Sequence, residues 1–171
     1  EGVEDPACGA VIDLRTDETV ATFEGKIPLD EQARIIYSFW EKYNKPYIVP
    51  ERNASGLSLI DKLVAMGINT FHHYTKTTGK SEPKLGWWTG PSTRPVMLVD
   101  LSEMVRLRQF RIPQEHMVRQ FLSFVRNKDN QDGVAVKGKH DDWVMVYAIY
   151  WQIKKSVPVG EVQIHSYTYR E

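Results

Sequence analysis

The chain has 171 residues, 42% hydrophobic and 11% aromatic, which suffices for one ordinary domain with a substantial core and is too apolar for a disordered segment. Its 22 basic residues balance its 22 acidic residues. A protein that binds nucleic acid through a uniformly basic surface is therefore excluded, and any polyanion contact must come from local clusters. The single cysteine, Cys8, excludes an internal disulfide and fits a reducing compartment. No apolar stretch is long enough to span a bilayer, and no signal peptide is visible.

The first half of the sequence predicts a hairpin followed by alternating helices and short strands. The expected elements, in chain order, are strands at 10–16 and 19–24, a helix at 28–43, a buried strand at 47–49, a helix at 57–67 and a strand at 70–74. Pro28 and Asp30 are typical of a helix start, and Gly67 is typical of a helix end. The inner face of the second helix is expected to carry Leu57, Ile60, Leu63, Val64 and Ile68.

The second half predicts further helices separated by short strands. The expected elements are a helix at 93–107 that is broken or kinked around Pro95, a strand at 110–112, a helix from Pro113 with Met117, Phe121, Phe124 and Val125 inward, an edge strand at 134–136 and a helix at 141–153. Residues 158–171 alternate in a way that fits a terminal strand or an exposed tail. This order predicts an α/β domain with one mixed sheet flanked by helices on both faces. A strand before residue 10 would complete that sheet, and we expect it to be missing from this sequence, which begins at Glu1 without a Met.

Two adjacent carboxylates, Asp141 and Asp142, precede the apolar helix expected near the C-terminus. Helix capping explains one of them, because an Asp at the N-cap accepts a backbone hydrogen bond and favours the positive end of the helix dipole. Two in a row, after Lys139 and His140, exceed what capping requires. Carboxylate oxygens are the hard ligands that Mg²⁺ uses together with water and substrate phosphate, so a cation site is the alternative interpretation.

Other acids could join this pair. Glu51 follows a short strand, and reactive groups gather at strand ends in open sheets; a solvated loop acid is the alternative. Asp5 precedes the first visible strand, and a flexible terminal acid is the simpler interpretation there. Asn53 orients an acid or a phosphate, or it forms an Asx-turn. Three or four converging acids hold two metal ions about 4 Å apart, which clamp the attacking and leaving oxygens of a phosphodiester.

Basic and aromatic residues occur in local groups. The basic groups are Lys76, Lys80 and Lys84; Arg94; Arg106, Arg108 and Arg111; and Lys137, Lys139 and His140. Lys139 stands out, since it offsets the repulsion of the adjacent acids or contacts a phosphate. Trp87 and Trp88 stack on a nucleotide or fill a core. The histidines show no metal-ligand spacing, and no Gly-rich phosphate loop, zinc-type Cys pair or nucleophilic Ser or Cys constellation is present.

Several short segments, taken together in their order and spacing, carry a family resemblance. They are residues 1–5, 11–14, 20–26, 50–56, 85–89, 93–95 and 140–145. This arrangement resembles the nuclease domain of the large terminase subunit of tailed phages, which has an RNase H-like fold. The resemblance covers nearly the whole chain. It implies a single nuclease domain over residues 1–171, without the ATPase motor domain that the family carries.

The resemblance also implies a metal site. In that family an acid on the first strand, an acid after the fourth strand and an Asp of a His-Asp-Asp-like motif bind Mg²⁺ or Mn²⁺. Glu51 matches the second of these, and Asp141 and Asp142 match the third. The first-strand acid would fall upstream of Glu1, and Asp5 resembles an additional acid in the loop after that strand.

The resulting hypothesis is a metal-dependent DNA endonuclease that cuts concatemeric viral DNA during genome packaging. Glu51, Asp141 and Asp142 would hold Mg²⁺ or Mn²⁺, Lys139 would position a group or neutralise charge, and Asp5 would be secondary. The implied partners are double-stranded DNA, the terminase small subunit, the portal protein and the ATPase domain of the parent chain, with no membrane, in the host cytoplasm. The alternatives are another RNase H-like nuclease, such as a Holliday-junction resolvase, and a non-catalytic DNA-gripping or portal-docking module.

Overall fold

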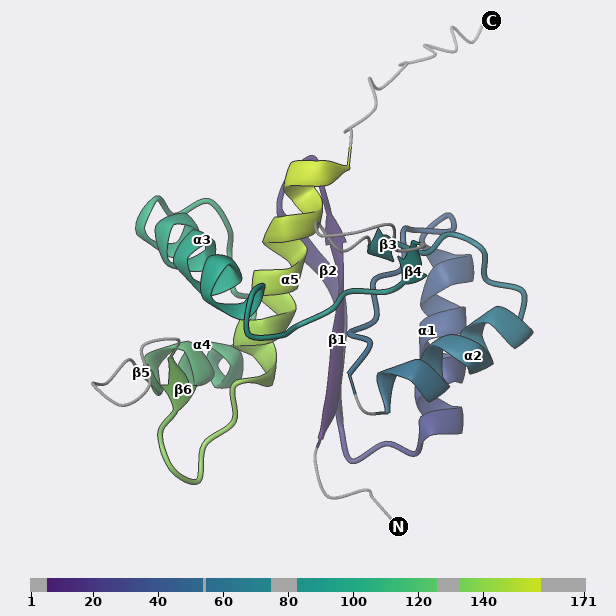
Figure 1. Cartoon of the computed structure of the whole chain (residues 1–171), viewed down its shortest axis with the longest axis horizontal. Coiled ribbons are helices and arrows are strands. Elements are labelled where there is room, and N and C mark those ends of the chain that lie inside the picture. The colour runs from purple at the N-terminus through teal and green to yellow at the C-terminus, as the bar shows by residue number, and fades with distance from the viewer. Residues whose placement is uncertain (1–5, 54, 75–82, 126–132, 158–171) are drawn as a thin grey trace, which may run out of the picture.

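A computed structural model of the chain describes residues 6–53, 55–74, 83–125 and 133–157. The fold is mixed α/β, and its described part contains five helices and three small antiparallel sheets. Figure 1 shows the hairpin of β1 and β2 between two groups of helices, with α3, α4 and α5 on one side and α1 and α2 on the other. The bounds are β1 Ala7–Asp13, β2 Glu18–Gly25, α1 Leu29–Lys42, α2 Gly56–Ala65, β3 His73–Tyr74, β4 Lys84–Leu85, α3 Arg94–Arg106, α4 Glu115–Leu122, β5 Phe124–Val125, β6 Val134–Ala135 and α5 Asp142–Ser156.

The hairpin predicted near the N-terminus is confirmed. β1 and β2 pair antiparallel from Ala7 opposite Gly25 to Asp13 opposite Glu18, with an irregularity after Val11. The turn contains Asp17 at a φ of 60°, a left-handed conformation that Asp tolerates better than most residues. The Asp17 carboxylate also accepts hydrogen bonds from the Tyr150 hydroxyl and the Lys154 ammonium. The turn is thereby tied to the last part of α5.

The larger hydrophobic core surrounds α5, which packs against β1, α3 and α4. Trp143, Tyr147 and Ala148 are completely buried, so apolar side chains cover α5 on most of its circumference, as in a helix at the centre of a domain. The Tyr147 hydroxyl lies 2.9 Å from the Thr19 hydroxyl, which satisfies its polar atom inside the core. This helix, predicted at 141–153, fixes the position of the two acids that precede or begin it.

The smaller core joins α1 and α2. Its buried residues are Ala33, Trp40, Leu63, Ile68 and Phe71. The Trp40 indole donates to the Thr70 hydroxyl at 2.7 Å, and that hydroxyl donates to the Pro46 carbonyl at 2.7 Å. Gly67, at a φ of 89°, ends α2 as predicted. Leu57 and Val64 are exposed instead of inward, because α2 packs on α1 chiefly through one narrow face.

The strands differ most from the prediction. Within the described residues, the expected single sheet is present as three two-stranded sheets plus two isolated parallel bridges, Ile48 with Phe71 and Glu51 with Trp87. The expected strand at 47–49 is reduced to the first of these bridges, and Tyr47 is 43% exposed. No strand forms at 110–112; Phe110 instead stacks near Tyr147 with a 4.8 Å centroid separation.

Two helix predictions are also corrected. Pro95 lies in the first turn of α3, where a missing amide proton costs nothing, so it starts the helix and does not kink it. Phe124 and Val125 form β5 with β6 and do not continue α4. Asp5, Lys76, Lys80 and residues 158–171 lie outside the described residues. Among the described helices, none has the length and apolarity needed to cross a membrane.

The packing of α3 on α5 generates a stability prediction. Leu101 is 4% exposed and Val99, on the outer side of the same helix, is 55% exposed. We expect Leu101→Ala to lower the free energy of unfolding by about 2 to 5 kcal/mol, because a cavity remains in the core. Val99→Ala should change it by about 0.5 kcal/mol or less. Urea unfolding of both variants checks this, and equal losses would contradict the described burial of α3.

Candidate functional site

Asp141 and Asp142 occupy the start of α5. Asp141 stands at the N-cap position, but its side chain makes no capping hydrogen bond. Its carboxylate instead accepts a hydrogen bond from the Arg94 guanidinium, with Nη2 and Oδ2 3.0 Å apart. Asp142 lies in the first turn, with His140 Nδ1 3.7 Å from its Oδ2. Helix capping therefore does not account for the Asp141 side chain.

Glu51 is held by backbone contacts with the segment around Trp87. The Arg52 amide donates to the Trp87 carbonyl and the Trp87 amide donates to the Pro50 carbonyl, each at 2.8 Å. A Cβ on Gly56 would lie 1.7 Å from the Glu51 carbonyl oxygen, so only glycine allows this close approach of the loop to the start of α2. The Asn53 side-chain amide donates to Glu51 Oε1 at 3.3 Å, which favours the orienting role considered for it.

Three acids act on one thiol near the start of β1. Burial, and then the negative charges of Asp142, Glu24 and Glu51, raise the pKa of the Cys8 thiol well above its ordinary value. Charge effects of this kind fall off steeply with distance. Glu51 and Asp142 therefore contribute to the same negative field beside β1, although 91 positions of sequence separate them.

Glu24 is the member of this group that sequence reasoning missed. It stands directly opposite Cys8 in the β1–β2 register, and its Oε2 lies 2.6 Å from His116 Nε2. Nothing in the sequence distinguishes it from the other acids of a half-exposed strand. A correct register for the predicted hairpin is the signal that would have placed it next to Cys8.

The donor chemistry of these acids suits a hard divalent cation, because their ligand atoms are carboxylate oxygens. Within the described ranges, however, no three His, Cys, Asp or Glu side chains are grouped closely enough to hold a metal ion. A cation that keeps several water ligands needs only one or two carboxylates, which Glu51, Asp141 and Asp142 can offer. Asp5 lies outside the described residues, so its predicted place near them stays a prediction.

Lys139 lies in an exposed turn just before the acids. Its amide donates to the Val136 carbonyl at 2.8 Å, and Gly138 adopts a φ of 78° in the same turn. Within the described part of the chain its ammonium group forms no ion pair. Lys139 is exposed, and its predicted contact with a phosphate remains a prediction.

His72 and Trp87 pack against other aromatic side chains. The Trp87 ring lies 5.8 Å from the His72 ring and 5.9 Å from the Tyr74 ring. Its indole nitrogen lies 3.2 Å from Met97 Sδ. Trp87 thus joins the bridge segment to α3, which favours the packing interpretation of this residue over nucleotide stacking.

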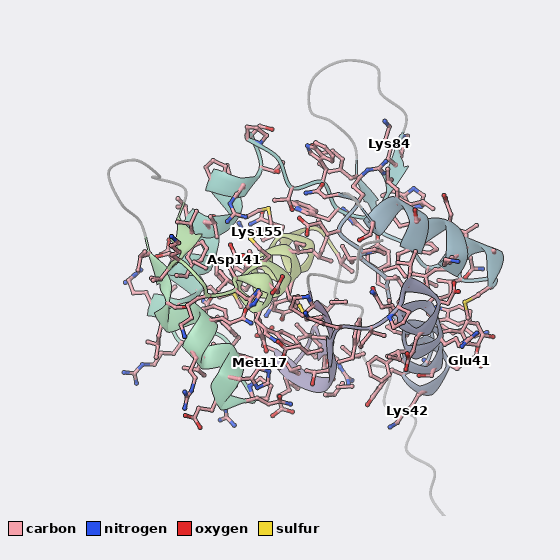
Figure 2. The ribbon with its side chains drawn as sticks, turned by 90° about the horizontal axis from the view of Figure 1, so that it is seen from below. Glu41, Lys42, Lys84, Met117, Asp141 and Lys155 are labelled. Carbon is pink, nitrogen blue, oxygen red and sulfur yellow. The ribbon has the colours of Figure 1, made fainter. Side chains whose placement is uncertain are left out.

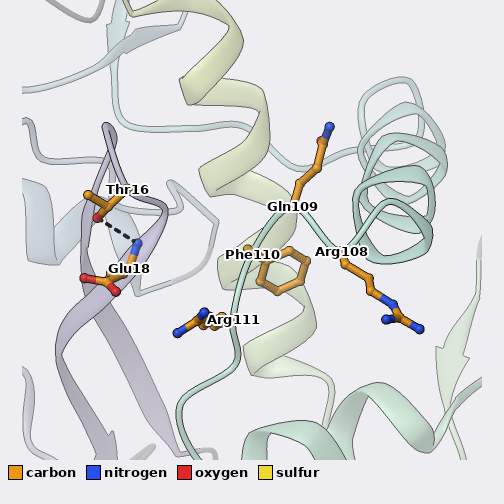
Figure 3. Close-up of a pocket in the computed structure, with 6 residues that line it drawn as sticks. All are labelled: Thr16, Glu18, Arg108, Gln109, Phe110 and Arg111. Atoms are coloured by element: carbon orange, nitrogen blue, oxygen red, sulfur yellow. Dashed lines mark hydrogen bonds between the residues drawn. The ribbon is translucent and has the colours of Figure 1, made fainter.

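A separate surface hollow lies at the turn end of the hairpin. It has a volume of about 210 Å³ and is lined by Thr16, Glu18, Arg108, Gln109, Phe110 and Arg111. In Figure 3 the Arg108 guanidinium points away from the hairpin and the Arg111 side chain points toward it. Cys8 is five strand residues from Asp13, or ~17 Å in extended chain. The hollow is therefore not part of the acidic site, and Glu18 in its lining disfavours an anion there.

Three solved structures of one phage nuclease are similar in fold to this chain. The large terminase nuclease from thermophilic phage G20c with bound cobalt superposes with a TM-score of 0.68 and 21% identity, covering 89% of this chain and 77% of that one. The magnesium-bound form gives 0.66 and 19%, covering 87% and 75%. Another structure of the same nuclease gives 0.65 and 19% with the same coverage. At these identities the likeness establishes the fold. No protein-family profile and no curated protein matches the sequence.

The charge environment of Cys8 generates a pH prediction. The thiolate is the reactive form, and the raised pKa keeps the folded thiol neutral at pH values where the unfolded thiol has already ionised. We therefore expect iodoacetamide to modify Cys8 much more slowly in the native chain than in urea, with a native pH profile displaced upward. Folding stability should correspondingly fall as pH rises through the ordinary thiol pKa, since only the unfolded state releases the proton.

A substitution that removes one negative charge tests whether charge, as well as burial, raises the pKa of the Cys8 thiol. Glu51→Gln should move the native pH profile of Cys8 modification downward, because it removes one of the negative charges that raise the thiol pKa. Glu41→Gln is the matched control, since Figure 2 shows Glu41 on α1 well away from Asp141. Identical profiles for the two variants would show that Glu51 does not act at Cys8.

Proposed function

We propose that the chain is a metal-dependent DNA endonuclease of the large-terminase type, with an RNase H-like active site, that cuts concatemeric viral DNA during genome packaging. The main supporting observation is that Asn53 links Glu51 to the Thr89 carbonyl, while Arg94, five residues further on, pairs with Asp141. The shared fold supports it, since the G20c nuclease structures include cobalt-bound and magnesium-bound forms. The order of sequence segments that resembles this family supports it independently.

The proposed ligands come from Glu51, Asp141 and Asp142, with one or two carboxylates on an ion and water completing its coordination, and Asp5 is an additional acid. Mg²⁺ or Mn²⁺ held there would neutralise charge on the scissile phosphate and activate the attacking water, in the two-metal manner or with a single ion. Two side chains of the protein position these acids: Asn53 orients Glu51 and Arg94 holds Asp141. Lys139, exposed in the turn before the acids, is proposed to contact the phosphate of the bound strand.

The proposed substrate is double-stranded DNA. Because the formal net charge is zero, the chain supplies only local cationic groups, and firm binding would depend on partners that hold the DNA. The proposed partners are the terminase small subunit, the portal protein and an ATPase domain of the parent chain, in the host cytoplasm. A related junction resolvase would differ by preferring branched DNA, and a docking module would differ by binding no cation through these acids.

Substitution of the acids tests the proposal. Asp142→Asn and Glu51→Gln should each weaken Mn²⁺ binding measured by calorimetry. They should also reduce Mn²⁺-dependent nicking of plasmid DNA by ~100-fold or more. Loss of a group that only hydrogen-bonds a metal ligand can already cost that much. Asp61→Asn, an exposed acid on α2, should leave both unchanged. The physical reason is that only the first two changes remove ligand oxygens while keeping side-chain volume.

The outcomes separate the rival functions. If Asp142→Asn and Glu51→Gln bind the cation as the unsubstituted chain does, the metal-site assignment is overturned and a docking module is favoured. Cation-dependent cleavage confined to four-way junctions would favour a resolvase. Retained native circular dichroism in each variant is the control for folding.

A further inference from the structure

The segment at residues 88–94 lies between the two acid-bearing parts of the chain. We infer that it is a brace that fixes Glu51 and Asp141 relative to each other, with Asn53 and Arg94 as positioning residues at its two ends. This inference rests on the proposed function, because it assigns these residues a role toward the cation that the acids would hold.

Asn53 forms the end of the brace beside Glu51. Its Nδ2 donates to Glu51 Oε1 at 3.3 Å and to the Thr89 carbonyl at 3.0 Å. A carboxylate and a backbone carbonyl both act only as acceptors. The orientation of the Asn53 amide is therefore fixed by its surroundings, since a flipped amide would place oxygen against two oxygens. Glu51 is thus connected through one side chain to the first part of the 88–94 segment.

The middle of the brace is a closed turn. The Gly90 amide donates to the Thr93 hydroxyl at 2.8 Å, and that hydroxyl donates to the Trp88 carbonyl at 2.9 Å. The Arg94 amide donates to the Gly90 carbonyl at 2.9 Å. A Cβ on Gly90 would lie 2.5 Å from the Trp88 indole nitrogen, so glycine allows the Trp88 ring to cover the turn. These bonds join the Thr89 region rigidly to the start of α3.

Arg94 forms the end of the brace beside Asp141. Its Nη2 lies 3.0 Å from Asp141 Oδ2 and 3.3 Å from the Gly133 carbonyl, and its Nη1 lies 3.1 Å from Met145 Sδ. The Arg94 and Asp141 side chains are 27% and 32% exposed, so solvent screens the pair only in part. Arg94 engages one carboxylate oxygen of Asp141 and leaves Oδ1 for another partner, such as a cation.

Charge and geometry make opposite contributions at Arg94. The positive charge of the guanidinium repels a nearby cation, so removal of charge alone would tighten cation binding. The planar fork, in contrast, fixes the direction of the Asp141 carboxylate, and a lysine ammonium cannot reproduce its three contacts. Groups that orient a metal ligand typically contribute ~10- to 100-fold to metal affinity. We therefore expect the positioning effect to exceed the repulsion.

The test is a Mn²⁺ titration by calorimetry on the whole chain. We expect Arg94→Ala and Arg94→Lys each to weaken Mn²⁺ binding by ~10-fold or more, with thermal unfolding midpoints that stay above the titration temperature. Arg106→Ala is the matched control. It removes an arginine from the other end of α3, where Arg106 is 68% exposed and pairs only with Glu103 among the described residues. It should bind Mn²⁺ as the unsubstituted chain does.

A double-mutant cycle tests whether the two ends act as one unit. Asn53→Ala should weaken Mn²⁺ binding, and Asn53→Ala combined with Arg94→Lys should weaken it by less than the product of the two single effects. The reason is that loss of either end already frees one acid from the other. If the loss of Mn²⁺ affinity in the double variant equals the product of the two single losses, Asn53 and Arg94 act independently and the brace is overturned.

Each remaining outcome is decisive. If the unsubstituted chain binds no Mn²⁺, the proposed function itself is overturned. Suppose instead that the unsubstituted chain binds Mn²⁺, that Arg94→Ala binds it more tightly and that Arg94→Lys binds it equally well. Arg94 would then act only by its charge, and this result would overturn the inference but not the proposed function. Unchanged binding in both Arg94 variants would overturn it equally.

Discussion

The burial of α5 is the constraint on which the rest of the structure depends. Completely buried Trp143 and Tyr147 fix the rotation of this helix, and its two ends are fixed by polar contacts. Near the C-terminal end, Gln152 and Lys155 donate to Asp100 while Tyr150 and Lys154 donate to Asp17. At the other end, the Trp143 amide donates to Gln120 Oε1 at 2.9 Å. A helix held in this way cannot slide or turn, so the acids at its start have a defined position.

The acidic site follows from that anchoring. The carboxylates of Glu24, Glu51 and Asp142, on three separate elements, all raise the pKa of the Cys8 thiol, and a chain with no net charge has no long-range field to offset the cost of that negative charge. Local partners offset part of the cost instead, through Arg94 at Asp141, His116 at Glu24 and Asn53 at Glu51. At the proposed site a cation would complete the charge balance beside these partners.

Local sequence patterns predicted most helices well, because helical periodicity and end signals depend on residues within a few positions of one another. α1, α2 and α5 agree with the prediction to within a few residues. Short strands were predicted less well, since an extended segment becomes a strand only when another segment pairs with it. The segment at 110–112 has strand composition and finds no such partner. The family resemblance, which rests on order and spacing over the whole chain, is confirmed as a likeness of fold.

The sequence by itself determined the identity and order of the helices and hairpin, and it singled out Glu51, Asp141 and Asp142 as unusual acids whose metal-binding role stays a prediction. Only the tertiary structure decided that Asp141 pairs with Arg94 and that Glu24 faces Cys8. The physical reason is that side-chain partners across elements depend on strand register and on the rotation of each docked helix. Neither is encoded within a few residues of the atoms that meet; both are set by how the cores pack.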